Sequence, residues 1–340
     1  MVIRVKDALR LLRNKFFEAL YIGVTPLLSQ FSSRIIFTYA SEAKQDGTGA
    51  QIQRNLAIYA LSKRLGASFV YTPIGSVAIH PLDPFQTLPE MNLFLQEVNF
   101  AFELPSCGSK HDIRSLFLPS LTLRAYLKIV IQTLFRNQDV LIRMIEPYAF
   151  LDRMPHLYKL ATNDLLNWKL IKTNSVNEQI GETPKLAIHY RQGVGGLVVQ
   201  FGEKYPREIP ISYFLDFLNN HLNVSDFGSI DIFTDAPKSN MFFSPPQNQE
   251  KLWETNPKFD GKSMEVTATD LSSFAKLTSD RAQFHIGGSP LEAIISMSNA
   301  DVLVMGRSSL SYVAGLLNEN GKIFYPPDFW HSPLDSWVRY

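Results

Sequence analysis

The sequence predicts an α/β protein, and three observations lead to this class. In residues 185–340, short apolar runs of strand length alternate with segments of helical spacing. In the first half, the strand-like run 34–39 leads through a glycine-containing turn into a helix-like segment at 50–66. The chain has 340 residues, of which 45% are hydrophobic and 19% charged, which is enough for two globular domains.

The first half is expected to mix helices with a few short strands. Helical spacing appears over 5–20, 50–66, 90–101, 122–137 and 156–171, and strands are expected near 34–39 and 68–72. Residues 172–184 are polar and end in Pro184, which is typical of an interdomain linker. We therefore expect an N-terminal domain over 1–175 and a C-terminal domain over 185–340.

In the second half, predicted strands and helices alternate regularly. Strands are expected at 185–190, 229–234, 283–286, 301–305 and 322–325, and helices at 212–220, 271–277, 291–297 and 309–317. Pro290 stands where the first turn of the third helix begins, a position that suits proline. Strands that alternate with helices form right-handed βαβ units, so a parallel Rossmann-like sheet is predicted.

Polar and glycine residues follow each strand of the second half. Ligands of open parallel sheets bind at the carboxyl ends of the strands, so these residues are expected to face one crevice. They are His189, Arg191 and Gln192; Thr234 and Asp235; His285, Gly287 and Gly288; and Gly306, Arg307, Ser308 and Ser309. Arginines, hydroxyls and a helix start are suited to binding an anion such as a phosphate.

Each of these residues also has a structural interpretation. His189 could be a core histidine bonded to a carbonyl, Arg307 could pair at the surface, and Ser308 and Ser309 could only cap a helix. Arg191 is the hardest to explain structurally, because it leaves a buried strand into a glycine-rich loop. The glycine turn of the first half, with Gly47 and Gly49, could serve an anionic ligand or only form a tight turn.

Composition excludes some function classes. The formal net charge of +1 gives no reason to expect nucleic acid as a partner. No metal site is expected, since there is no Asp-x-Asp motif and no His and Cys set with zinc-ligand spacing; Asp235 and Asp301 are the carboxylates to reconsider if a metal proves necessary. The single cysteine, Cys107, suits a reducing compartment, so a cytoplasmic location is expected.

The first twenty residues form a basic amphipathic pattern. Basic residues (Arg4, Lys6, Arg10, Arg13, Lys15) alternate with apolar ones (Val5, Leu9, Leu12, Phe16, Leu20). This segment could dock on its own domain, or it could attach the protein peripherally to a membrane.

Three separated motifs resemble the α1,2-, α1,6- and protein O-fucosyltransferase superfamily. They are Gly47-Thr-Gly-Ala-Gln51 before a helix, His189-Tyr-Arg191 at a strand end, and the stretch from Ser298 to Ala314 with its Ser-Ser helix start. The resemblance implies a GT-B-like fold, in which two Rossmann-like domains face a central cleft. It also implies an inverting, metal-independent glycosyltransferase that moves fucose from GDP-fucose to a glycan hydroxyl, with no cofactor beyond the nucleotide-sugar.

The resemblance implies roles for individual residues. Arg191 matches the arginine that neutralises the leaving diphosphate, and Ser308 and Ser309 match serines that contact it. The expected donor-binding set is Gly47, Gly49, Gln51, His189, Arg191, Thr234, Asp235, His285, Arg307, Ser308 and Ser309. A general base must reach the acceptor hydroxyl, and Asp46, His80 and Asp83 in N-terminal loops are the candidates beside Arg191 in the catalytic set.

Two departures from the motifs leave the donor open. Gln192 stands where the superfamily has a second arginine, and Ala50 stands where it has an asparagine. UDP-xylose or another nucleotide-sugar is therefore an alternative donor. A non-catalytic nucleotide- or carbohydrate-binding protein of the same fold is the alternative from another functional class.

Overall fold

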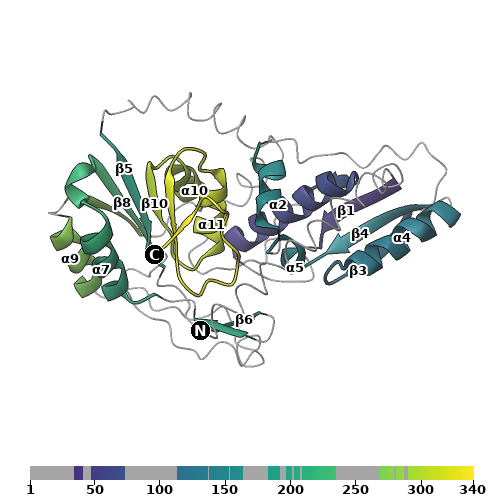
Figure 1. Cartoon of the computed structure of the whole chain (residues 1–340), viewed down its shortest axis with the longest axis horizontal. Helices are drawn as coiled ribbons and strands as arrows, with labels where there is room; N and C mark the ends of the chain where they lie inside the picture. Colours follow the sequence, from purple (N-terminus) through teal and green to yellow (C-terminus); the bar gives the residue numbers. More distant parts are fainter. Residues whose placement is uncertain are drawn as a thin grey trace, which may run out of the picture. The chain divides into compact units, whose positions relative to one another are not determined.

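The computed structural model divides into two compact units. Unit 1 comprises Met1–Gln45, Gln51–Val77 and Glu90–Ile171, and unit 2 comprises Asp46–Ala50, Ala78–Pro89 and Lys172–Tyr340. The structure describes residues 34–40, 47–72, 113–136, 138–152, 154–163, 183–191, 197–200, 203–206, 209–234, 268–278, 281–286 and 290–340. Each unit contains a parallel sheet with helices packed on it (Figure 1), so the α/β class is confirmed.

Unit 1 has a four-stranded parallel sheet in the order β2-β1-β4-β3. Its strands are β1 (Ile35–Tyr39), β2 (Ser68–Val70), β3 (Ile113–Leu118) and β4 (Asp139–Met144). Its helical elements are α2 (Thr48–Leu65), α4 (Leu123–Arg136), α5 (Tyr148–Leu151) and the 3₁₀ turn Pro155–Leu157.

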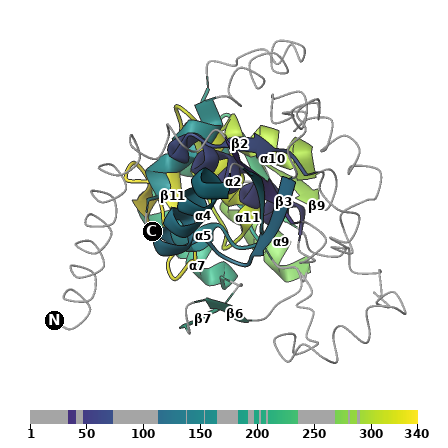
Figure 2. The same cartoon turned by 90° about the vertical axis from the view of Figure 1, so that its right-hand side faces the viewer.

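Helices α2 and α4 pack on the same face of this sheet. Phe37 and Phe69 are register partners in β1 and β2, so their side chains share a face. Tyr59 of α2 meets Phe69 edge-on at 5.3 Å, and Tyr126 of α4 stacks on Phe37 at 6.0 Å between ring centroids. Right-handed crossovers require this arrangement, because β1 to β2 and β3 to β4 both step in the same direction across the sheet. Figure 2 shows α2 and α4 next to each other.

Unit 2 has a six-stranded parallel sheet in the order β12-β11-β10-β5-β8-β9. Its strands are β5 (Lys185–His189), β8 (Ser229–Thr234), β9 (Ala282–Ile286), β10 (Val302–Val304), β11 (Lys322–Tyr325) and β12 (Val338–Arg339). Its helices are α7 (Ile211–His221), α9 (Ala268–Leu277), α10 (Pro290–Ser298) and α11 (Ser309–Leu317), with a 3₁₀ turn at Val224–Asp226. A separate antiparallel pair consists of β6 (Leu197–Gln200) and β7 (Glu203–Pro206).

The core of unit 2 lies between the sheet and helices α7 and α9. Leu186 and Ile188 of β5 belong to one buried cluster with Phe214 of α7 and Phe274 of α9. Tyr190, which follows β5, meets both phenylalanine rings edge-on, at 5.5 and 5.1 Å. Helices α10 and α11 lie on the opposite face of the sheet (Figure 1), so both faces are covered, as a parallel sheet requires.

The sequence predictions match this description closely in unit 2. All five predicted strands and all four predicted helices are present there, within a few residues at their ends. In unit 1 the predictions for 34–39, 50–66, 68–72 and 122–137 are confirmed, whereas strands β3 and β4 were missed. For 156–171, a 3₁₀ turn at Pro155–Leu157 runs into helix at 158–163. Segments 5–20 and 90–101 lie outside the described residues.

Candidate functional site at the switch point of unit 2

The strand order of unit 2 predicts that a ligand would bind at the carboxyl ends of β5 and β10. In order along the chain, the six parallel strands are arranged 3-2-1-4-5-6, which is the order of a Rossmann sheet. The direction of winding reverses between the first and fourth of these strands, β5 and β10, which are direct neighbours. Crossover connections leave this pair to opposite sides, so the space beyond their carboxyl ends stays open to a ligand.

Two of the predicted anion-binding residues meet at this point. Arg191 follows the end of β5, and its Nη1 donates a hydrogen bond to Oγ of Ser308, 3.4 Å away, after β10. Ser308 is 5% exposed and His189, the last residue of β5, is 3% exposed. The tertiary structure thus brings together residues that are 117 positions apart in the sequence.

Ser308 is also the N-cap of α11. It has extended backbone dihedrals, and its Oγ accepts a hydrogen bond from the backbone N–H of Leu310 at 3.2 Å. In both bonds the Ser308 oxygen is the acceptor, so neither bond uses the hydroxyl hydrogen. The start of a nine-residue helix, with its partial positive charge, therefore lies beside the Arg191 guanidinium.

Gly306 allows the two strand ends to approach. A Cβ at this position would lie 2.5 Å from the carbonyl oxygen of His189 and 3.6 Å from Cβ of Arg191. The 2.5 Å contact is with backbone, which cannot move aside as a flexible side chain can. Any residue larger than glycine would push β5 and the β10–α11 connection apart.

Arg307 contacts the C-terminal segment. Its Nε donates to the carbonyl oxygen of Pro327 at 2.8 Å, and its Nη2 lies 3.8 Å from Oδ2 of Asp328. Arg307 is 7% exposed, and this burial lowers the pKa of its guanidinium, while the Asp328 carboxylate opposes that shift. Arg307 therefore has a charge partner, but its side chain is buried and does not lie at the surface as the structural interpretation assumed.

His285 and Thr234 belong to strands on the side of β5 away from β10. Thr234 ends β8 and is 4% exposed. His285 stacks on Phe233 with centroids 4.6 Å apart, and its Nε2 lies 2.6 Å from Oδ1 of Asp231. The other Asp231 oxygen lies 3.1 Å from Nζ of Lys185. Sequence reasoning missed this ion-pair chain, because no local pattern relates residues on three separate strands.

The glycine turn of the sequence lies beside the start of α11. Residues Asp46–Ala50 group with unit 2, and a Cβ on Gly49 would lie 2.6 Å from the backbone nitrogen of Leu310. Gly47 has open space around its Cα, and Gln51 is 1% exposed. Gly49 is therefore required because its backbone packs closely against the backbone of Leu310. This packing agrees with the interpretation that the glycines serve a structural role in a tight turn.

Several predicted site residues lie outside the described residues. They are Asp46, His80, Asp83, Asp235 and Gln192. Asp301 is described, and it occupies the opposite end of the sheet, where its Oδ2 accepts the backbone N–H of Lys185 at the start of β5, 2.7 Å away. Asp301 is therefore ruled out as a ligand at the carboxyl ends of β5 and β10.

Tyr340 contacts the connection between β10 and α11, and this contact was not predicted from the sequence. Its hydroxyl donates to the carbonyl oxygen of Met305, just after β10, at 2.6 Å. Its ring lies 4.6 Å from that of Phe217, and its own carbonyl accepts from the Tyr213 hydroxyl at 2.9 Å. Burial raises the pKa of the Tyr340 phenol well above its usual value.

The described residues contain neither a candidate metal cluster nor a helix suited to spanning a membrane. No three His, Cys, Asp or Glu side chains in the described ranges are grouped so that they could hold a metal ion. Among the described helices, none combines the length and apolar character that crossing a bilayer demands.

Gly306→Ala tests the packing at the switch point. We expect it to destabilise the protein by about 1–3 kcal/mol, because the added methyl overpacks against the His189 carbonyl. Gly47→Ala is the matched control, since a Cβ there meets nothing within 4 Å. Urea unfolding measures both. Equal stability of the two variants would show that β5 and β10 do not depend on this glycine.

Tyr340→Phe tests the support of the Met305 carbonyl. At pH 7 the loss of this hydrogen bond should cost about 1 kcal/mol. Because the folded state raises the phenol pKa, the unfolded chain releases this proton first, and the contribution of Tyr340 is lost as pH rises above about 10. The difference in unfolding free energy between wild type and Tyr340→Phe should therefore shrink above pH 10. A difference that stays constant to pH 11 would contradict this assignment.

Comparisons with known proteins identify no family. No protein-family model and no curated protein matches the sequence. Among solved structures, the chain is similar to E. coli heptosyltransferase WaaC with ADP, with 9% identity, a TM-score of 0.35 and coverage of 86% of this chain and 87% of that one. It is also similar to E. coli ADP-heptose lps heptosyltransferase II, with 12% identity, a TM-score of 0.31 and coverage of 87% of this chain and 86% of that one. A putative aspartate carbamoyltransferase from Trypanosoma cruzi matches with 12% identity, a TM-score of 0.22 and coverage of 96% of this chain and 83% of that one. At such identities and TM-scores, none of the three assigns the chain to a family.

Proposed function

We propose that the protein is a glycosyltransferase of GT-B type that transfers a sugar from a nucleoside-diphosphate donor to a glycan hydroxyl. The observation that carries the proposal is the hydrogen bond from Arg191 to Ser308 at the switch point of unit 2. It joins a guanidinium, a serine hydroxyl and a helix N-terminus at the one place where an open parallel sheet binds its ligand. This combination suits the diphosphate of a nucleotide-sugar.

In the proposed reaction the acceptor oxygen attacks the anomeric carbon and the bond to the diphosphate breaks. Negative charge grows on the leaving phosphate oxygen, and the guanidinium of Arg191 stabilises it. The Ser308 hydroxyl hydrogen and the first backbone N–H groups of α11 can donate to the same phosphate. Inversion is part of the proposal, because a single direct displacement inverts the anomeric carbon. Metal independence is also part of it, since these groups supply positive charge at the leaving phosphate.

GDP-fucose is the preferred donor in this proposal. The support is the sequence likeness of the His189-Tyr-Arg191 and Ser308-Ser309 motifs to the fucosyltransferase superfamily. Because Gln192 and Ala50 depart from that pattern, UDP-xylose or another nucleotide-sugar is the alternative donor. Asp46, His80 and Asp83 remain the proposed candidates for the general base, with unit 1 on the acceptor side.

A non-catalytic nucleotide-binding protein is the second candidate function. Arg307, one of the two arginines expected at the phosphate, is bonded to Pro327 and paired with Asp328. If these contacts persist when a nucleotide-sugar binds, Arg307 contributes less to stabilising the charge that develops on the leaving diphosphate. Ligand binding without turnover of any nucleotide-sugar would support this candidate.

Arg191→Ala tests the proposed leaving-group contact. Removing a donor from a transition-state site costs on the order of 3–4 kcal/mol, so we expect a 10²- to 10³-fold loss of transfer rate. Arg339→Ala is the matched control, because Arg339 is an exposed arginine of β12. Transfer from GDP-fucose, UDP-xylose and ADP-, GDP- and UDP-linked hexoses to mixed glycan acceptors is the measurement.

Thermal shift with ADP, GDP and UDP separates binding from chemistry. A bound nucleotide raises the melting temperature by mass action, and Arg191→Ala should reduce that rise. A GDP preference supports the fucose donor, and a UDP preference supports xylose. Wild-type turnover in Arg191→Ala would contradict the proposed role of this residue.

Chelation tests metal independence. Transfer should persist in excess EDTA, and added Mg²⁺ or Mn²⁺ should change its rate only slightly. If EDTA stops turnover and Mn²⁺ restores it, the leaving phosphate is stabilised by a cation, and Asp235 becomes the carboxylate to substitute first.

A further inference from the structure

Helix α4 of unit 1 has two apolar stripes instead of one. Tyr126, Ile129 and Val130 form the buried stripe that faces the sheet, and none of them is more than 6% exposed. A second stripe has the helical spacing i, i+4, i+7, i+8 on another side of the helix. It consists of Leu127, Ile131, Leu134 and Phe135.

The second stripe is open to solvent. Ile131 is 51% exposed, Leu134 46% and Phe135 87%. Phe135 is the most exposed large apolar side chain among the described residues. Single exposed apolar residues are common, but a continuous helical stripe of them marks a contact surface.

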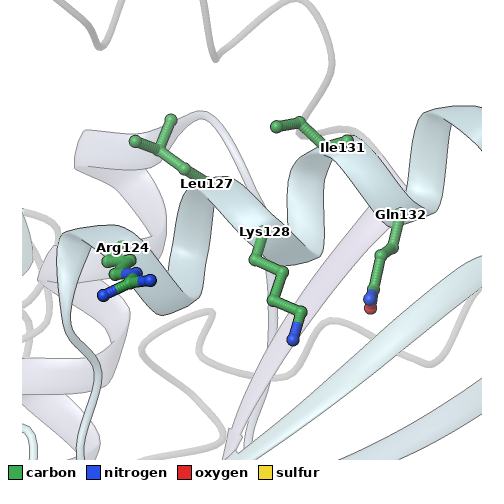
Figure 3. A pocket seen from close by; sticks show the side chains of 5 residues that line it. All are labelled: Arg124, Leu127, Lys128, Ile131 and Gln132. Carbon is green, nitrogen blue, oxygen red and sulfur yellow. The ribbon is translucent and has the colours of Figure 1, made fainter.

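The charged residues that α4 itself carries are all positive. Figure 3 shows Leu127 and Ile131 on one side of α4 and Arg124 and Lys128 on another, one helical turn apart in each pair. Arg136 ends the helix. The sequence of α4 contains no aspartate or glutamate. We name the surface formed by Arg124, Leu127, Lys128, Ile131, Leu134 and Phe135 the α4 stripe.

The charge of the α4 stripe argues against a second copy of this chain as its partner. Among the described residues, those that line the hollow beside it all belong to α4: Arg124, Leu127, Lys128, Ile131 and Gln132. A stable protein interface needs roughly 1,000 Å² or more of complementary surface. A second copy docked symmetrically would bring like charges together, since each copy presents Arg124 and Lys128.

We propose that the α4 stripe is a membrane-contact surface that binds the face of a bilayer containing anionic lipids. The apolar side chains would enter the boundary between headgroups and acyl chains, and Arg124 and Lys128 would pair with lipid phosphates. This placement pairs the positive charges that α4 presents with the negative charges of the lipid headgroups. The proposal does not depend on the function proposed for unit 2.

The N-terminal sequence is a second candidate for membrane contact. Residues 4–20 have a basic amphipathic pattern, which is also typical of segments that lie at a membrane surface. Stable attachment to a bilayer generally takes two weak signals, and these two sequences could supply both. The experiment must therefore isolate the contribution of α4.

Vesicle co-sedimentation of the full chain tests the proposal. Wild type should bind vesicles of phosphatidylcholine with 30% phosphatidylglycerol and should bind pure phosphatidylcholine much more weakly. Phe135→Ser should weaken binding to the anionic vesicles by about tenfold or more, given the apolar surface that it removes. Arg124→Glu with Lys128→Glu should weaken it by a similar factor.

Matched controls are available on other surfaces. Leu160→Ser removes a partly exposed leucine of unit 1, and Lys276→Glu reverses an exposed charge of α9; both should bind as wild type. Circular dichroism confirms the fold of each variant. The proposal fails if the α4 variants bind vesicles as wild type, if wild type binds neutral and anionic vesicles equally, or if sedimentation shows a dimer that Phe135→Ser dissociates.

Discussion

The close approach of β5 and β10 at their carboxyl ends is the constraint on which the rest of unit 2 depends. The two strands pair directly, and the connection after β10 passes so near the His189 carbonyl that only glycine fits at position 306. This approach brings Arg191 within hydrogen-bonding distance of Ser308 and fixes where α11 begins. A displacement of a few tenths of an ångström at Gly306 would separate the guanidinium from the helix N-terminus.

The C-terminal segment holds this arrangement from the other side. Tyr340 bonds the Met305 carbonyl while its ring packs on Phe217, and the turn at Pro327 and Asp328 fixes Arg307. Gly315 of α11 lets Trp337 approach, since a Cβ there would lie 3.1 Å from the indole ring. The C-terminal segment and its aromatic residues thus stabilise the connection between β10 and α11, which contains Arg307 and Ser308.

Both units have a parallel sheet with an arginine at its carboxyl ends, but the partners of that arginine differ between the units. In unit 1, Arg54 of α2 is 2% exposed near the carboxyl ends of β1 and β4, where it pairs with Glu146 at 3.7 Å and lies over the ring of Tyr148. A buried arginine is costly unless it is paired, so this contact anchors α2 to the sheet. In unit 2 the corresponding place carries Arg191 and Ser308, which face the open end of the sheet.

The sequence by itself determined the α/β class, five strands and the four helices of unit 2, and the residues at its strand ends. It did so because buried parallel strands and amphipathic helices leave strong local periodicity. In unit 2 it missed β6, β7 and β12. In unit 1 it missed β3, an edge strand whose polar and apolar residues alternate weakly, and β4, which carries Asp139 and Arg143 among its apolar residues. Only the tertiary structure decided which strand ends are neighbours. It placed Arg191 beside Ser308, turned Arg307 toward Asp328 and tied His285 to Asp231, because these contacts depend on strand order and not on local sequence.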